Sequence, residues 1–157
     1  MSTYLSILAD VKAKIESVTD VGMVYDYYRW NNDLGAFIAL FSFTPTGGSK
    51  QIRGWEITRV SVREHQDGAF FRHHDFQVEG YMSLSDADAS DKTFQVLVDD
   101  VCAAFRTAAD GPTWYYLNGD DPRLSPAQVE VIDVRMFGNV LCHHARIRVS
   151  VTERIIP

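Results

Sequence analysis

Residues 55–84 read WEITRVSVREHQDGAFFRHHDFQVEGYMSL, and this stretch decides the fold. Apolar and polar side chains alternate on both sides of Gln66-Asp67-Gly68, as they do in strands that bury one face. Two alternating segments joined by a short Asp-Gly turn are typical of a β-hairpin. We therefore predict two long antiparallel strands. In the first, Thr58, Val60 and Val62 are expected on one face, with Trp55, Ile57, Arg59 and Arg63 on the other. In the second, one face gathers Phe76, Val78, Gly80, Met82 and Leu84, and the other gathers His73, Asp75, Gln77, Glu79 and Tyr81.

A second hairpin is predicted nearer the C-terminus, where Val129 to Phe137 and Val140 to Glu153 alternate around Gly138-Asn139. A two-residue connection that contains glycine favours such a turn. The last strand separates an apolar face from a polar one. Leu141, Ala145, Ile147, Val149 and Val151 form the apolar face, and Cys142, His144, Arg146, Arg148, Ser150 and Thr152 form the polar one.

Two amphipathic helices are predicted, over residues 3–18 and about 91–109, because their apolar residues recur at helical spacing. Val21 to Trp30 is expected to be extended, and Ala36 to Phe43 is a second short apolar run before the loop at 44–49. Helices separated by hairpins, without regular βα alternation, indicate an α+β fold. We predict one domain over residues 1–157, an antiparallel or mixed β-sheet with two amphipathic helices packed on one face.

Composition limits the classes of function. The chain has 157 residues, 46% of them hydrophobic, and a formal net charge of -6. These values fit one globular domain and argue against a general nucleic-acid binder, which carries a basic surplus. The start has no basic segment followed by an apolar run, and no stretch is long enough for a membrane span, so we expect neither a signal peptide nor membrane insertion. Two cysteines without CxxC spacing are expected to be free thiols.

Two histidine-containing clusters are the candidates for chemistry. His73 and Asp75 share a strand face, but a metal site needs further ligands at the same point. Cys142 and His144 also share a face, although side chains two positions apart on a strand lie too far apart for a short hydrogen bond. The loop Thr46-Gly47-Gly48-Ser49-Lys50 lacks the spacing of a phosphate-binding loop. We therefore predict no catalytic residue, metal or cofactor. A shared site from neighbouring strands stays open.

Arginines gather on the predicted polar face although the protein is acidic. They are Arg59, Arg63, Arg135, Arg146 and Arg148. Two interpretations stay open, a solvated face with cross-strand ion pairs or a surface for a protein partner, where arginine is enriched.

The layout resembles the tail terminator (tail-completion) proteins of long-tailed bacteriophages across nearly the whole chain. The resemblance includes the short N-terminal helix and the loop after the first strands. It also includes the paired strands Gly54-Trp55-Glu56-Ile57-Thr58-Arg59 and Phe76-Gln77-Val78-Glu79-Gly80-Tyr81, the helix from Phe94 to Phe105, and the closing strand Ala145-Arg146-Ile147-Arg148-Val149-Ser150-Val151-Thr152-Glu153.

This resemblance implies a structural role in the virion, at the head-proximal end of the tail, after assembly in the host cytoplasm. Family members form a hexameric ring that caps the tail tube, ends its polymerisation and offers a docking surface to the head. The implied partners are other copies of the chain, the tail tube protein and a head-completion or connector protein, with DNA passing through the lumen. We expect ring contacts on the polar face and the 44–53 loop, with Lys50 and Arg53 facing a neighbour or the channel. The alternative is a small-ligand-binding or enzymatic domain that uses His73, Asp75, Cys142 or His144.

Overall fold

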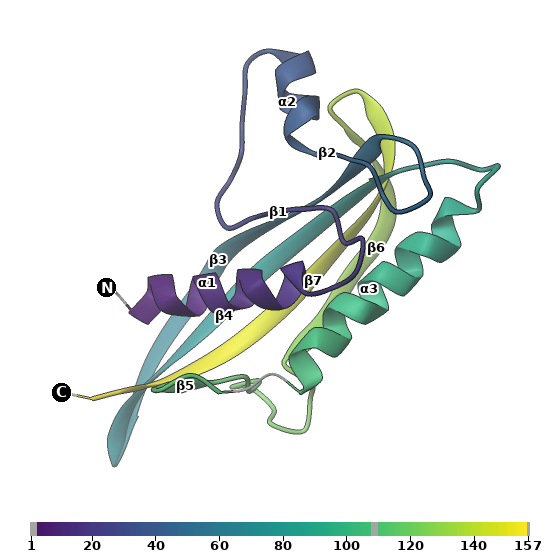
Figure 1. The fold of residues 1–157 in the computed structure, drawn as a ribbon. Coiled ribbons are helices and arrows are strands. Elements are labelled where there is room, and N and C mark those ends of the chain that lie inside the picture. The colour runs from purple at the N-terminus through teal and green to yellow at the C-terminus, as the bar shows by residue number, and fades with distance from the viewer. Residues whose placement is uncertain (1–2, 108–109, 157) are drawn as a thin grey trace.

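The computed structural model describes residues 3–107 and 110–156, whose strands form one seven-stranded sheet (Figure 1). The order is β1-β3-β4-β7-β5, with β2 added beside β3 and β6 beside β7. Among the strands of the described residues, only the β1–β3 pair is parallel. The predicted α+β fold with a mixed, largely antiparallel sheet is confirmed. The strands are β1 Met23–Tyr25, β2 Ser42–Phe43, β3 Gln51–Asp67, β4 Ala69–Ser83, β5 Trp114–Tyr115, β6 Ala127–Phe137 and β7 Val140–Ile155.

Both predicted hairpins are present. β3 turns into β4 at Gly68, whose φ of 67° is a left-handed conformation that glycine adopts without strain. β6 turns into β7 at Gly138 and Asn139, with φ values of 55° and 68°. Two consecutive positive φ values are typical of a type I′ turn, whose twist matches that of the paired strands.

The described residues form three helices, where two were predicted. α1 (Thr3–Glu16) and α3 (Ser90–Arg106) are the predicted pair; residues 108–109 of the expected second helix lie outside the described part. α2 (Leu34–Leu40) occupies most of the short apolar run, and the side chain of Asp33 caps its start by accepting from the Ala36 N–H at 3.1 Å. The expected extended segment from 21 to 30 is reduced to the three residues of β1.

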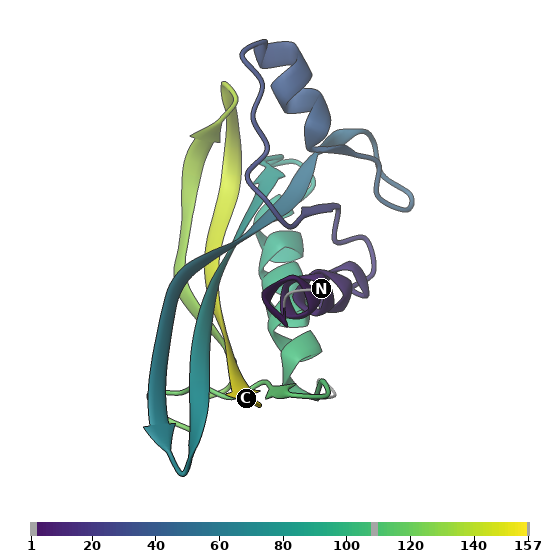
Figure 2. The same cartoon turned by 90° about the vertical axis from the view of Figure 1, so that its left-hand side faces the viewer.

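α1 and α3 lie side by side on one face of the sheet (Figure 2). They bury apolar side chains such as Ile7 and Val11 of α1 and Phe94 and Val98 of α3 against the strands, where Trp55 is 1% exposed. Burying such a side chain contributes about 1.5–3 kcal/mol. The predicted packing of both helices on one face is confirmed.

A smaller apolar cluster lies where α2 meets the β6–β7 turn. It joins Phe41, Ile52, Phe137 and Cys142, with Phe37 of α2 packed against it. α2 thereby covers one end of the sheet on the side away from α1 and α3. No helix in the described part of the chain is both long and apolar enough to cross a membrane.

Candidate functional site

The side of the sheet that faces away from α1 and α3 is largely uncovered, and we call it the open face (Figure 2). α2 covers one end of it. The loop after β5 reaches the other end, where Thr152 Oγ1 donates to Leu117 O at 3.5 Å. Between these ends the register places Glu79 opposite Arg146 and Gln77 opposite Arg148. The polar face expected from alternation in β4 and β7 is therefore present.

Three arginines of the open face are held by carboxylates of the same chain. Arg63 Nη1 lies 2.6 Å from Asp120 Oδ1, and Arg148 Nη2 lies 3.4 Å from Glu130 Oε2. Arg146 Nε is 3.8 Å from the other oxygen of Glu130. All three side chains stay one third to one half exposed. The charges are thus balanced within the subunit, while the guanidinium groups stay accessible to a partner.

Asp75 lies at the centre of this group. Ser150 Oγ donates to its Oδ1 at 2.9 Å, and its Oδ2 lies 3.9 Å from both Arg63 Nη2 and Arg148 Nη1. The carboxylate is nearly buried, and a buried carboxylate requires such partners. These contacts give Asp75 a structural role in orienting the two arginines.

His144 forms a second polar group on the open face, closer to α2. Its Nδ1 donates to Asp133 Oδ1 at 2.7 Å, and its Nε2 lies 3.5 Å from Glu79 Oε1. The contact with His144 holds the pKa of the Glu79 carboxyl below its usual value. Arg135 Nε donates to the same Asp133 at 2.9 Å, so Arg135 lies on the open face as predicted.

Arg59 does not lie on the open face, and the prediction that placed it there was wrong. A β-bulge at Val60 shifts the register between Arg59 and Ser61. Odd-numbered residues of β3 therefore face the helices before the bulge and the open face after it. Before the bulge, Arg59 lies opposite Phe76, on the side of the helices, as do Trp55 and Ile57. After it, Arg63 lies opposite His73 on the open face.

Arg59 instead lies at the exposed margin of a polar group beneath α1, in which His74 and Glu153 are buried. Its guanidinium lies 4.3 Å from the centre of the Tyr4 ring, and its Nη1 lies 3.4 Å from His74 Nδ1. His74 Nε2 lies 2.8 Å from Glu153 Oε2, and Arg72 Nη1 lies 3.7 Å from the same oxygen. Alternation indicated only that His74 points away from His73; nothing in the sequence showed its partners, which come from other strands.

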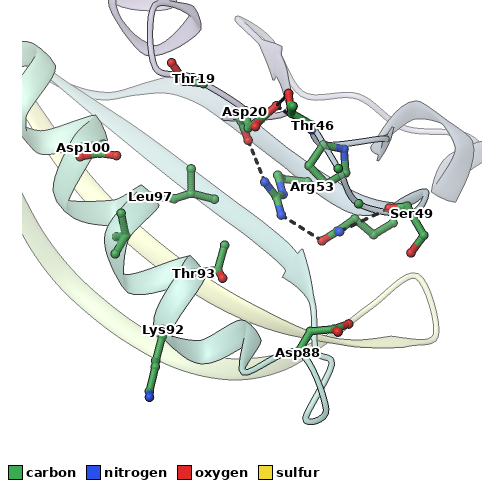
Figure 3. A pocket seen from close by; sticks show the side chains of 15 residues that line it. Thr19, Asp20, Thr46, Ser49, Arg53, Asp88, Lys92, Thr93, Leu97 and Asp100 are labelled. Carbon is green, nitrogen blue, oxygen red and sulfur yellow. Dashed lines mark hydrogen bonds between the residues drawn. The ribbon is translucent and has the colours of Figure 1, made fainter.

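Arg53 is also on the helix side, 6% exposed, rather than on the open face or a free surface. Its Nη1 donates to Asp20 O at 2.9 Å and its Nη2 to Gln51 Oε1 at 3.3 Å (Figure 3). Its Nε has no hydrogen-bond partner within the described residues. Burial lowers the pKa of this guanidinium from its ordinary value. The expectation that Arg53 faces a neighbour directly is therefore corrected, while Lys50 is exposed and its predicted contact stays a prediction.

An open groove of about 990 Å³ separates the 44–50 loop from α3, and Arg53 lies at its base (Figure 3). Lys92 and the carboxylates of Asp20, Asp88 and Asp100 also line it. Three acidic and two basic side chains leave an acidic balance. The α3 contribution was missed from the sequence because Asp88, Lys92 and Asp100 read as ordinary solvated positions near or on an amphipathic helix.

The four residues of the alternative enzymatic hypothesis do not converge. His73 lies opposite Thr152 on β7, whereas Cys142 lies opposite Ser83 at the other end of that strand. Ten positions along an extended strand correspond to roughly 30 Å. Burial raises the pKa of the Cys142 thiol to about 11, which opposes thiolate formation.

The described residues include no group of three or more histidine, cysteine or acidic side chains placed to hold a metal ion. His143 is buried, and its Nε2 lies 2.8 Å from Ser90 Oγ. Two surfaces thus remain as candidate sites, the open face and the groove.

In comparisons with known proteins, no protein-family model matches the chain, and no curated protein matches it.

Proposed function

We propose that this chain is a structural subunit of a bacteriophage tail, which forms a ring that caps the tail tube, ends its polymerisation and provides the interface for head joining. The resemblance in layout first suggested this role. The observation that carries it is the position of the two candidate surfaces. The open face and the 44–50 loop lie on opposite sides of the subunit (Figure 2).

A closed ring requires such an arrangement, because one patch of each subunit must meet a different patch of the next. Each surface offers charged groups that the other can bind. Arg63, Arg146 and Arg148 are accessible on the open face, and the groove has an acidic rim that includes Asp88 and Asp100. In the proposed ring, the arginines of one subunit face the acidic groove of its neighbour. Lys50 at the loop then lies at this contact, with Arg53 buried at the groove base behind it, whereas Arg59 contacts Tyr4 and His74 of its own subunit.

The remaining partners follow from the proposed position at the end of a tail. They are the tail tube protein on one side and a head-completion or connector protein on the other, with DNA passing through the lumen. A net charge of -6 suits that passage, since an acidic surface does not retain DNA.

The test is light scattering after size exclusion, with negative-stain images, for the protein alone and mixed with tail tubes. A ring, in solution or at the tube end, is the expected result. Arg146→Glu with Arg148→Glu should abolish it. Lys12→Glu with Arg106→Glu makes the same charge change on α1 and α3, on the other side of the sheet, and should leave it intact. A parent protein that forms no ring in solution and never caps a tube contradicts the proposal.

A further inference from the structure

One edge of the sheet is a long strand to which the described residues supply no outer partner. β6 pairs with β7 from Ala127 to Phe137, and no other strand in the described part of the chain pairs with it. β5 joins β7 farther along, at Thr152 and Glu153. An unpaired edge presents backbone N–H and C=O groups that another strand can bind.

This edge also exposes a row of apolar side chains. Val129, Ile132, Val134 and Met136 lie on the helix side of β6, and each is between 42% and 61% exposed, because α3 does not cover them. Natural proteins rarely leave a long apolar edge uncovered, since it promotes association. A β-bulge between Val129 and Val131 limits the regular part of the edge to residues 131–137.

The sequence of this regular part, Val131-Ile132-Asp133-Val134-Arg135-Met136-Phe137, is complementary to itself. In an antiparallel pair centred on Val134, each Asp133 lies opposite the Arg135 of the second copy. Each Ile132 lies opposite Met136, and the two Val134 residues face each other. Opposite charges and apolar pairs placed directly across a ladder both stabilise it.

Side-chain positions agree with this pairing. Asp133 and Arg135 lie together on the open face, bonded at 2.9 Å and partly exposed, so each can bind a second opposite charge. The apolar row lies on the other face. We propose that β6 binds the β6 of a second copy, antiparallel about a twofold axis at Val134, so that the two sheets continue into one another.

The other free edge of the sheet is a poorer partner for β6. β3 also exposes Val60 and Val62. However, a head-to-tail pair that sets Asp133 against Arg63 places Ile132 against Glu64, whose carboxylate is held by Arg72. Self-pairing leaves no such mismatch. The twofold contact describes the free protein and does not depend on the proposed tail function.

Cysteine crosslinking tests the pairing directly, in a Cys102→Ser background. Opposite residues of an antiparallel pair have Cα separations within disulfide range. Under mild oxidation, Val134→Cys should form a covalent dimer about tenfold or more faster than Val96→Cys, a slightly more exposed valine on α3, because pairing raises the local thiol concentration. Equal rates would overturn the proposal. Faster crosslinking of Val134→Cys to Val62→Cys than to itself would also overturn it, in favour of head-to-tail edges.

Charge exchange gives an independent measurement by light scattering. The parent should elute as a dimer of 17.8 kDa chains. Arg135→Asp places like charges opposite each other and should yield monomers, while Asp133→Arg with Arg135→Asp restores opposite pairs and should restore the dimer. A parent monomer, or a dimer indifferent to Arg135→Asp, would overturn the inference. Neither result bears on ring formation at a tail tube, which the images test separately.

Discussion

His74 Nε2 lies 2.8 Å from Glu153 Oε2 in the interior beneath α1, and both side chains are almost fully buried. On the other side of the imidazole, Arg59 Nη1 is the only hydrogen-bond partner that the described residues offer to His74 Nδ1, at 3.4 Å. Arginine can only donate, so Nδ1 must accept and the proton must lie on Nε2. The imidazole is therefore neutral in the folded protein.

Stability should consequently fall on mild acidification. Burial lowers the pKa of His74 below its usual value, so the folded chain binds fewer protons than the unfolded chain as the pH drops below about 6.5. Urea unfolding at pH 7.5 and 5.5 should give a smaller free energy of unfolding at the lower pH. His74→Gln should reduce that difference, whereas His65→Gln, on the exposed end of the hairpin, should leave most of it. A parent protein that is equally stable at both values would contradict this account.

Two arginines should differ in their effect on stability. Arg59→Gln removes both the contact with the Tyr4 ring and the donor to His74, and we expect a loss of about 1 kcal/mol. Arg148→Gln removes surface ion pairs with Asp75 and Glu130, and we expect a change of about 0.5 kcal/mol or less. Chemical denaturation of the two variants measures both. A larger loss for Arg148→Gln would reverse the assignment of the two roles.

Gly80 should tolerate no side chain. A Cβ there would lie 2.3 Å from the ring of Trp55, which is buried opposite it on β3. Gly80→Ala should destabilise the fold by roughly 1–3 kcal/mol through overpacking. Gly35→Ala in α2 is the matched control: its nearest neighbour is 3.4 Å away, and alanine is favoured in a helix by about 0.5–1 kcal/mol. Thermal unfolding should separate the two variants in opposite directions.

The two thiols should react at different rates in the folded protein. Cys142 is fully buried, with a pKa near 11, while Cys102 is partly exposed. Iodoacetamide at pH 8 should modify Cys102 first and Cys142 only slowly, since the thiolate is the nucleophile. Mass spectrometry of native and denatured samples, with Cys102→Ser isolating Cys142, gives the rates. Rapid modification of Cys142 in the native state would mean that the α2 cluster opens readily.

Long alternating segments allowed much of the fold to be predicted. β4 and β7 alternate without interruption, so His73, Asp75, Arg146 and Arg148 were placed on the correct face. The prediction for β3 was wrong at one point. Arg59-Val60-Ser61 continues a regular pattern in the sequence, yet Val60 forms a bulge, and no local residue signals it. The helix α2 was not predicted for another reason: a short apolar run fits a strand and a helix equally well.

The candidate surfaces were only partly predictable. The open face follows from periodicity along single strands. The groove does not, because it joins the 44–50 loop, Arg53 and α3, segments brought together only by packing. The same is true of Glu153, which reaches His74 from a strand distant in the sequence. Side chains that meet from distant parts of the sequence form no motif of fixed spacing, so their contact cannot be predicted from the sequence.

β7 pairs with β4, β5 and β6, and it follows all three of them in the chain. During synthesis, the β3–β4 hairpin can therefore form early, but its inner edge stays without a neighbour until residues 140–155 have left the ribosome. Until then the apolar face of β4 is only partly sheltered. The late arrival of one strand thus sets the moment at which the subunit becomes competent to associate, so incomplete chains are kept out of any assembly that needs a finished sheet.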